Sequence, residues 1–168
     1  ITTNIQAGAV YTDYRDSEHA WTFTDEQIQQ VTVTHNGRTL VAGENGDYTI
    51  ARGKDSSGKA LADRFVITFT ADQSGVTAEN PIRISYKTTL KTDDVAPGST
   101  VKYVNKSSLK SHDGRTDYSN AEYTYLAEQR MTKDVGEYNK DTGELTWLIK
   151  VNNTGSLKGT AVVVDELK

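Results

Sequence analysis

The chain has 168 residues, of which 35% are hydrophobic and 25% are charged, and its formal net charge is −4 at pH 7. This acidic balance argues against a nucleic-acid-binding surface, which is normally basic, and no apolar run approaches the length of a membrane span. The sequence contains no cysteine, which excludes disulfide bonds, thiolate metal sites and a cysteine nucleophile. Any covalent reinforcement must therefore use other side chains.

Short runs of alternating apolar and polar residues, separated by turn signals, predict an all-β chain. The first clear run is at residues 28–35, and Asn36-Gly37, a strong hairpin signal, follows it directly. Residues 25–30 are compatible with a single helical turn. Further strands are predicted at residues 47–51, 64–70, 81–90, 101–109, 144–152 and 159–167.

The remaining segments are polar or ambiguous. Residues 111–122 read as a polar loop, and residues 123–135 are compatible with either a strand or a short helix. The strands at 144–152 and 159–167 are expected to pair with each other. Many short strands with turns between them predict a β-sandwich of immunoglobulin type, and the absence of a cysteine–tryptophan–cysteine spacing excludes antibody-like domains.

The two tryptophans receive different predictions. Trp147 shares its strand face with apolar side chains of the segment ELTWLIKVN, so we expect it in a hydrophobic core. Trp21, in the polar stretch SEHAWTFTD, is the better candidate for a surface that binds a ligand.

The stretch VKYVNKSSL at residues 101–109 places an amide on an apolar face. In a strand, Val101, Tyr103, Asn105 and Leu109 share one face, and lysines occupy the other. An amide among apolar side chains is costly unless a partner satisfies it. The position of Asn105 on this face therefore needs a physical explanation.

Several segments together resemble a known family. The run MTKDVGEYNKDTGELTWLIKVNNTGSLKGTAVVVDEL is similar to the opening of the repeated Ig-like domains of Gram-positive cell-wall-anchored adhesins, the collagen-binding-adhesin type. IRISYKTTL and VKYVNKSSL are similar to later strands of those domains. The resemblance covers roughly residues 80–168 well and 25–70 loosely, whereas residues 1–24 match no part of the pattern.

The resemblance implies an intramolecular isopeptide bond. In such domains a lysine and an asparagine join beside an acidic residue, and here Lys133 resembles the nucleophile, Asn105 the acceptor and Asp165 the catalytic acid. Burial would lower the pKa of the lysine and raise that of the acid, and close positioning replaces an external catalyst. The reaction occurs once, so no turnover enzyme is implied. Each residue also has an ordinary alternative, since a buried Asn often satisfies a turn and Asp165 can begin one.

The order of these residues departs from the family, in which the lysine and the acid precede the asparagine. We therefore divide the chain into a main Ig-like β-sandwich at residues 1–128 and opening strands of the adhesin type at residues 129–168. The opening strands either complete the same sandwich, by permutation or strand exchange, or begin a second one. A lone pair of strands could not bury its faces, which favours completion of the first sandwich.

The leading hypothesis is a structural or adhesive module on the outside of a bacterial cell wall, next to neighbouring Ig-like domains. The alternative is an adhesin module that binds an extracellular-matrix protein or a glycan without a cross-link, by strand addition at a free edge. A glycosidase with two carboxylates is a weaker alternative, because no acidic pair stands out. No cofactor is expected, and His19, His35 and His112 are too scattered to predict a metal site.

Overall fold

The computed structural model describes residues 3–16, 23–128 and 131–151. Its elements are strands apart from one short helix, which confirms the predicted all-β class. None of the described residues forms a helix with the length and apolar character needed to cross a membrane. The elements are, in chain order, β1 (Thr3–Ile5), β2 (Val10–Arg15), α1 (Asp25–Gln29), β3 (Thr32–His35), β4 (Arg38–Thr39), β5 (Tyr48–Lys54), β6 (Ala60–Phe69), β7 (Gln73–Val76), β8 (Arg83–Ser85), β9 (Thr100–Lys110), β10 (Thr116–Leu126), β11 (Met131–Asn139) and β12 (Glu144–Val151).

The chain divides into two compact units. The first comprises the residues up to 91 together with 102–124, and the second comprises 92–101 and the residues from 125 onward.

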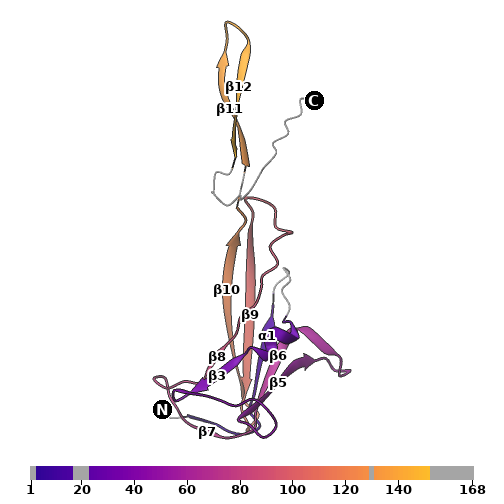
Figure 1. Ribbon diagram of the computed structural model, residues 1–168, viewed down its shortest axis with the longest axis vertical. Helices are drawn as coiled ribbons and strands as arrows, with labels where there is room; N and C mark the ends of the chain where they lie inside the picture. The colour runs from indigo at the N-terminus through magenta and orange to yellow at the C-terminus, as the bar shows by residue number, and fades with distance from the viewer. Residues whose placement is uncertain (1–2, 17–22, 129–130, 152–168) are drawn as a thin grey trace. The chain divides into compact units, whose positions relative to one another are not determined.

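The first unit is built on a five-stranded sheet with the order β10-β9-β2-β6-β5, in which β2 is the central strand. Figure 1 labels β5, β6, β9 and β10 of this sheet. Strand β2 pairs antiparallel with β6 on one side and with β9 on the other. A smaller sheet has the order β4-β3-β8, and β1 pairs with β7. Because β2 has a strand on each side, its backbone is hydrogen-bonded in two ladders, one to β6 and one to β9.

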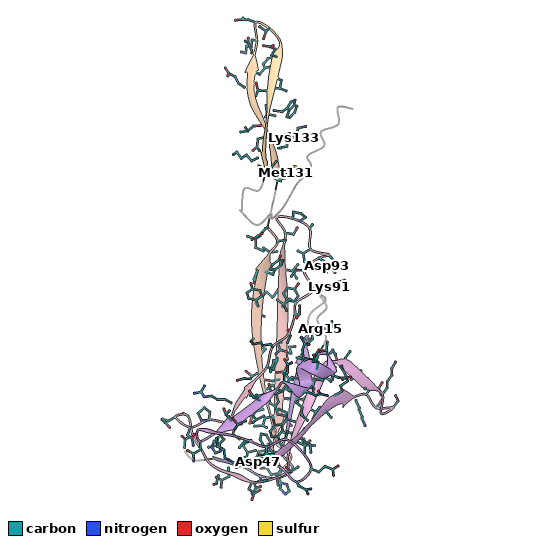
Figure 2. The ribbon with its side chains drawn as sticks, viewed as in Figure 1. Arg15, Asp47, Lys91, Asp93, Met131 and Lys133 are labelled. Carbon is teal, nitrogen blue, oxygen red and sulfur yellow. The ribbon has the colours of Figure 1, made fainter. Side chains whose placement is uncertain are left out.

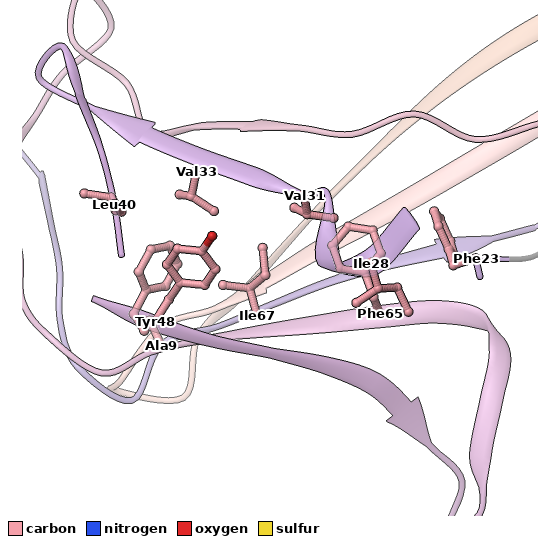
Figure 3. Close-up of a cluster of buried hydrophobic side chains, with 10 residues drawn as sticks. Ala9, Phe23, Ile28, Val31, Val33, Leu40, Tyr48, Phe65 and Ile67 are labelled. Atoms are coloured by element: carbon pink, nitrogen blue, oxygen red, sulfur yellow. The ribbon is translucent and has the colours of Figure 1, made fainter. Parts of the chain in front are cut away.

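One hydrophobic core takes side chains from both sheets of this unit (Figure 3). Strand β6 contributes Phe65, Ile67 and Phe69, which are almost fully buried, and β3 contributes Val33. The strand predicted at residues 64–70 is confirmed, and its alternating apolar residues form one buried face. Phe65 packs edge-on against the ring of Phe23, with centroids 5.0 Å apart.

Local signals explain two neighbouring elements. Helix α1 begins with a capping box, in which Gln27 N donates to Thr24 Oγ1 at 3.1 Å and Thr24 N donates to Gln27 Oε1 at 3.0 Å. The single turn expected at 25–30 is therefore confirmed, and it directs Ile28 into the core. The β3–β4 turn uses Asn36 and Gly37 at φ of 54° and 71°, as expected for this dipeptide in a two-residue hairpin.

Two expectations differ from the structure, and one strand lies where none was predicted. The segment 81–90 forms a ladder only at β8, because β3, its partner, begins at Thr32 just after α1. The predicted loop at 111–122 contains most of β10, whose polar sequence suits an edge strand exposed on both faces. Residues 1–24, which matched no pattern, supply the central strand β2.

The second unit contains the antiparallel hairpin β11–β12 (Figure 1). In its ladder Met131 lies opposite Val151 and Val135 opposite Trp147. Strand β12 confirms the strand predicted at 144–152, but its partner is β11; residues 159–167 lie outside the described residues. Trp147 is 48% exposed, so the expectation that it lies in a core is wrong. In the described part of this unit no second layer covers the exposed apolar side chains of β11 and β12.

Candidate functional site

Asp13 is a carboxylic acid in the core of the first unit. It lies on β2 opposite Phe65 of β6 and opposite Ser107 of β9, and it is only 1% exposed. Strand alternation places it on the same face as Tyr11, which packs partly against the core. A buried carboxyl group is unusual unless other groups satisfy it.

Two tyrosine hydroxyls and one amide surround this carboxyl. Tyr11 and Tyr86 both donate to Asp13 Oδ2, at 2.7 and 2.8 Å. Asn105 Nδ2 in turn donates to the hydroxyl oxygen of Tyr86 at 2.5 Å. The hydroxyl of Tyr86 therefore connects the acid of β2 to the amide of β9, and the ring of Phe65 packs against it with centroids 5.2 Å apart.

Two oxygens of this cluster are left without a partner. Asp13 Oδ1 and Asn105 Oδ1 are buried and have no hydrogen-bond partner among the described residues. A buried polar atom without a partner costs free energy, so each such atom in a folded protein calls for a physical reason. Both orphaned atoms are acceptors, so the cluster lacks a donor.

The surroundings of Asp13 favour its neutral form. Burial raises the pKa of the Asp13 carboxyl, although hydrogen bonding by Tyr11, Tyr86 and Asn105 opposes the shift. Burial and the nearby Asp13 charge also raise the pKa of Tyr11 and of Tyr86, which keeps both hydroxyls protonated as donors. A protonated Asp13 can itself donate a hydrogen bond, which would turn one of the orphaned acceptors into a donor.

The residues predicted from the sequence fall in different places. Asn105 lies on the core-facing side of β9, as its phase indicated, and it belongs to the Asp13 cluster. Lys133 lies on β11 in the second unit, exposed, with its Nζ 4.9 Å from the centroid of the Trp147 ring (Figure 2). Asp165 and Trp21 lie outside the described residues, so their predicted roles stay predictions.

Asp13 is the site residue that the sequence reasoning missed. The signal available was its phase, two residues after Tyr11 in VYTDYR, which places an acid and an aromatic ring on one strand face. That signal is weak, because burial of Asp13 depends on ladders to β6 and β9 that are far away in the sequence.

Within the described residues, no group of three or more histidine, aspartate and glutamate side chains gathers to hold a metal ion. Comparison with known proteins adds no relative: no family model, no curated protein and no solved structure matches the chain.

Proposed function

We propose that the chain is a structural and adhesive module of a bacterial surface protein, an Ig-like β-sandwich whose Asn105 accepts a covalent bond from a lysine. The observation that carries the proposal is the buried cluster of Asp13, Tyr86 and Asn105 with its two orphaned oxygens. The resemblance of VKYVNKSSL to the asparagine-bearing strand of cell-wall adhesins supports the same assignment of Asn105.

In this proposal Asp13 is the acid that serves Asn105. Burial raises the pKa of the Asp13 carboxyl and so favours its neutral form, and a neutral acid beside an amide can donate to the amide oxygen and polarise its carbonyl. The orphaned Asn105 Oδ1 is an acceptor for such a hydrogen bond in the same cluster. Asp165, which the resemblance assigned to this role, lies outside the described residues and stays a second candidate.

The bond-forming step balances without an external reagent. A neutral lysine Nζ attacks Asn105 Cγ, the Nζ–Cγ amide bond forms and the Cγ–Nδ2 bond breaks. Nδ2 leaves as ammonia and takes one hydrogen from Nζ, while Asp13 passes protons between the two nitrogens. Lys133 is the candidate nucleophile. No oxidation or reduction occurs, and the acid ends in the state in which it began.

The expected benefit is mechanical and thermodynamic. A covalent link restricts the unfolded chain much as a disulfide does, which suggests a stabilisation of about 2–4 kcal/mol. The chain has no cysteine, so a bond between amine and amide would be its means of covalent reinforcement. Such reinforcement suits a protein that bears load outside the cell.

The test is the intact mass of the denatured protein. We expect a deficit of one ammonia for each bond formed, and we expect the calculated mass in Asn105→Ala and in Lys133→Arg. Asn120→Ala is the matched control, because Asn120 is an exposed amide on β10. A wild-type protein with the full calculated mass would refute the cross-link, and loss of the deficit in the Asn120 variant would place it at a different residue.

A second candidate function is ligand binding without a cross-link. Strand β10 lies at the edge of the five-stranded sheet, and its Tyr118 and Tyr123 are 75% and 57% exposed. An extracellular-matrix protein or a glycan could bind along this edge, by strand addition or by stacking on the rings. Retention on immobilised collagen, fibrinogen or glycans, lost in Tyr118→Ala but kept in Asn105→Ala, would favour this function.

A further inference from the structure

The first unit contains a place for one more strand, beside residues 86–90. The ladder of β8 with β3 ends where β3 begins, at Thr32, but the strand-like alternation of burial continues past it. Tyr86, Thr88 and Leu90 are half-buried, and the residues between them are exposed. Residues 86–90 therefore have the pattern of a strand, and they have no ladder partner among the described residues.

A groove of about 230 Å³ lies against this segment. Its walls include Thr88, Leu90, Tyr103, Asn105, Ala121 and Tyr123. These residues come from the unpaired segment and from β9 and β10, so the groove follows the inner face of the sheet edge. Asn105 thus lies in the wall of a groove that a neighbouring strand would cover.

The contents of the groove define the chemistry of its occupant. Thr88, Leu90 and Tyr103 offer a largely apolar surface, whereas Asn105 offers a buried acceptor without a partner, its Oδ1, and Glu122 offers a carboxylate. An occupant that satisfies both features is an apolar strand face carrying a cationic N–H donor. A lysine among apolar neighbours has this character, because its charge complements the Glu122 carboxylate and its stem is apolar.

The hairpin β11–β12 carries such a face. Residues opposite one another in an antiparallel pair share a face, and alternate pairs along the ladder lie on the same side. The pair Lys133–Ile149 therefore lies with the pairs Met131–Val151 and Val135–Trp147. The apolar members of this face, called here the hairpin face, are Met131, Val135, Tyr138, Leu145, Trp147, Ile149 and Val151. Six of the seven are at least 40% exposed. An isolated two-stranded hairpin is marginal in water, and an exposed apolar face of this kind marks an interaction surface.

We propose that the hairpin of one copy of this chain fills the groove beside residues 86–90 in a second copy, with Lys133 directed toward Asn105. The two surfaces lie on different compact units of the same chain and are complementary in pattern and in charge. The contact is heterologous, because it uses the hairpin of one copy and the groove of the other. Each added copy brings a new hairpin and a new groove, so the assembly grows head to tail, into a ring where the rotation between copies closes and into an open chain where it does not.

Docking and covalent joining are separate steps. The docking follows from the groove and the hairpin face, whereas the covalent step rests on the function proposed above. In that step Lys133 Nζ of one copy bonds to Asn105 Cγ of the next, the Cγ–Nδ2 bond breaks, and ammonia leaves with one hydrogen from Nζ. Linked copies would therefore survive denaturation, and each link would lower the summed mass by one ammonia.

The first measurement is the oligomeric state of the full chain across a range of concentrations, by light scattering after size exclusion. We expect a series of species that grows with concentration. Trp147→Glu, on the hairpin face, should raise the apparent dissociation constant by about tenfold or more, because it places a charge in the contact. Leu148→Glu is the matched control on the opposite face, since Leu148 is 47% exposed and Trp147 48%. Equal effects of the two variants would overturn the proposal.

A second pair of matched variants tests the groove. Ala121→Arg places a long charged side chain in the groove and should prevent association, whereas Asn120→Arg lies on the other face of β10 and should not. Ala121 and Asn120 are both exposed, so neither variant disturbs the core.

Mixing the two defective variants tests the geometry directly. Trp147→Glu keeps a groove and Ala121→Arg keeps a hairpin, so each alone should be monomeric and the mixture should stop at a one-to-one dimer. A mixture that stays monomeric, or that forms long chains, would overturn the proposal. Dimers without an ammonia deficit would retain the docking and refute the cross-link, whereas a deficit within a single chain would retain the cross-link and refute the docking.

Discussion

Strands β6 and β12 have the same kind of sequence but opposite environments. In β6 the alternating residues Phe65, Ile67 and Phe69 are at most 2% exposed, and in β12 the alternating residues Leu145 and Trp147 are 40% and 48% exposed. Alternation determines which side chains share a face, because successive residues of a strand point to opposite sides. It does not determine whether a second layer covers that face.

The difference has a consequence for energetics. The face of β6 is stabilised within its own unit, by side chains from the smaller sheet, α1 and the segments around them. The face of β12 has no such cover in the described part of its unit, so its apolar area contributes to stability only when something docks on it. Substitutions in the two units test this contrast, from the largest expected effect on stability to the smallest.

The largest effect is expected from Phe65→Ala. Phe65 is fully buried and packs against the rings of Phe23 and Tyr86, so truncation leaves a cavity in the core. We expect a loss of about 3–5 kcal/mol in the free energy of unfolding, measured by urea denaturation. Trp147→Ala, measured where the chain is monomeric, should cost far less despite its larger side chain. Similar losses in the two variants would mean that the hairpin face is covered within its own chain.

A pH series tests the other unusual feature of the first unit, the buried carboxyl group of Asp13. The pKa of Asp13 is raised by burial, so the folded state binds the proton more tightly than the unfolded state. Stability due to this group is therefore present below the unfolded pKa and is lost as pH rises through the folded pKa. Asp13→Asn keeps an acceptor for Tyr11 and Tyr86 but cannot ionise, so its free energy of unfolding should gain on that of the parent as pH rises through this window.

The measurement is urea denaturation at a series of pH values, with both proteins carrying Lys133→Arg so that no bond to that lysine forms. All other carboxylates are present in both proteins, so their contributions cancel in the difference between the two free energies of unfolding. Asp113→Asn is a control of opposite sign, because hydrogen bonding from Ser111 lowers the pKa of Asp113 and its contribution is lost as pH falls. Parallel curves for Asp13→Asn and its parent would contradict the raised pKa.

Much of the fold follows from local patterns. The strands at 64–70 and 101–109 are marked by alternation, the β3–β4 turn by Asn36-Gly37, and α1 by its capping residues. What the sequence does not show is the choice of partner. Residues 81–90 have strand alternation throughout, but only 83–85 meet a neighbour, and the polar strand β10 forms because β9 is beside it.

The candidate site also contains one residue that the sequence placed correctly, Asn105, and one that it did not predict, Asp13. The phase of Asn105 among Val101, Tyr103 and Leu109 was sufficient to place its amide toward the core, because a strand has only two faces. Asp13 was not predicted, because an acid on a short strand is normally solvated. It is buried here because ladders to β6 and β9 hold β2 in the centre of the sheet. Those ladders join segments separated by fifty residues or more, beyond the reach of any local pattern.

The smallest effect is expected from Val135→Thr, in a pair with Val33→Thr. The substitution keeps the shape of the side chain and adds a hydroxyl, so its cost depends on whether water reaches the site. Val135 on β11 is 62% exposed, and its hydroxyl would be hydrated; we expect a change within about 0.5 kcal/mol where the chain is monomeric. Val33 on β3 is fully buried, and there the same change should cost about 1–3 kcal/mol. If Val135→Thr is neutral in the dilute monomer but weakens association at higher concentration, the hairpin face acts between copies; if it destabilises the monomer itself, the face is already covered, and the contrast between β6 and β12 disappears.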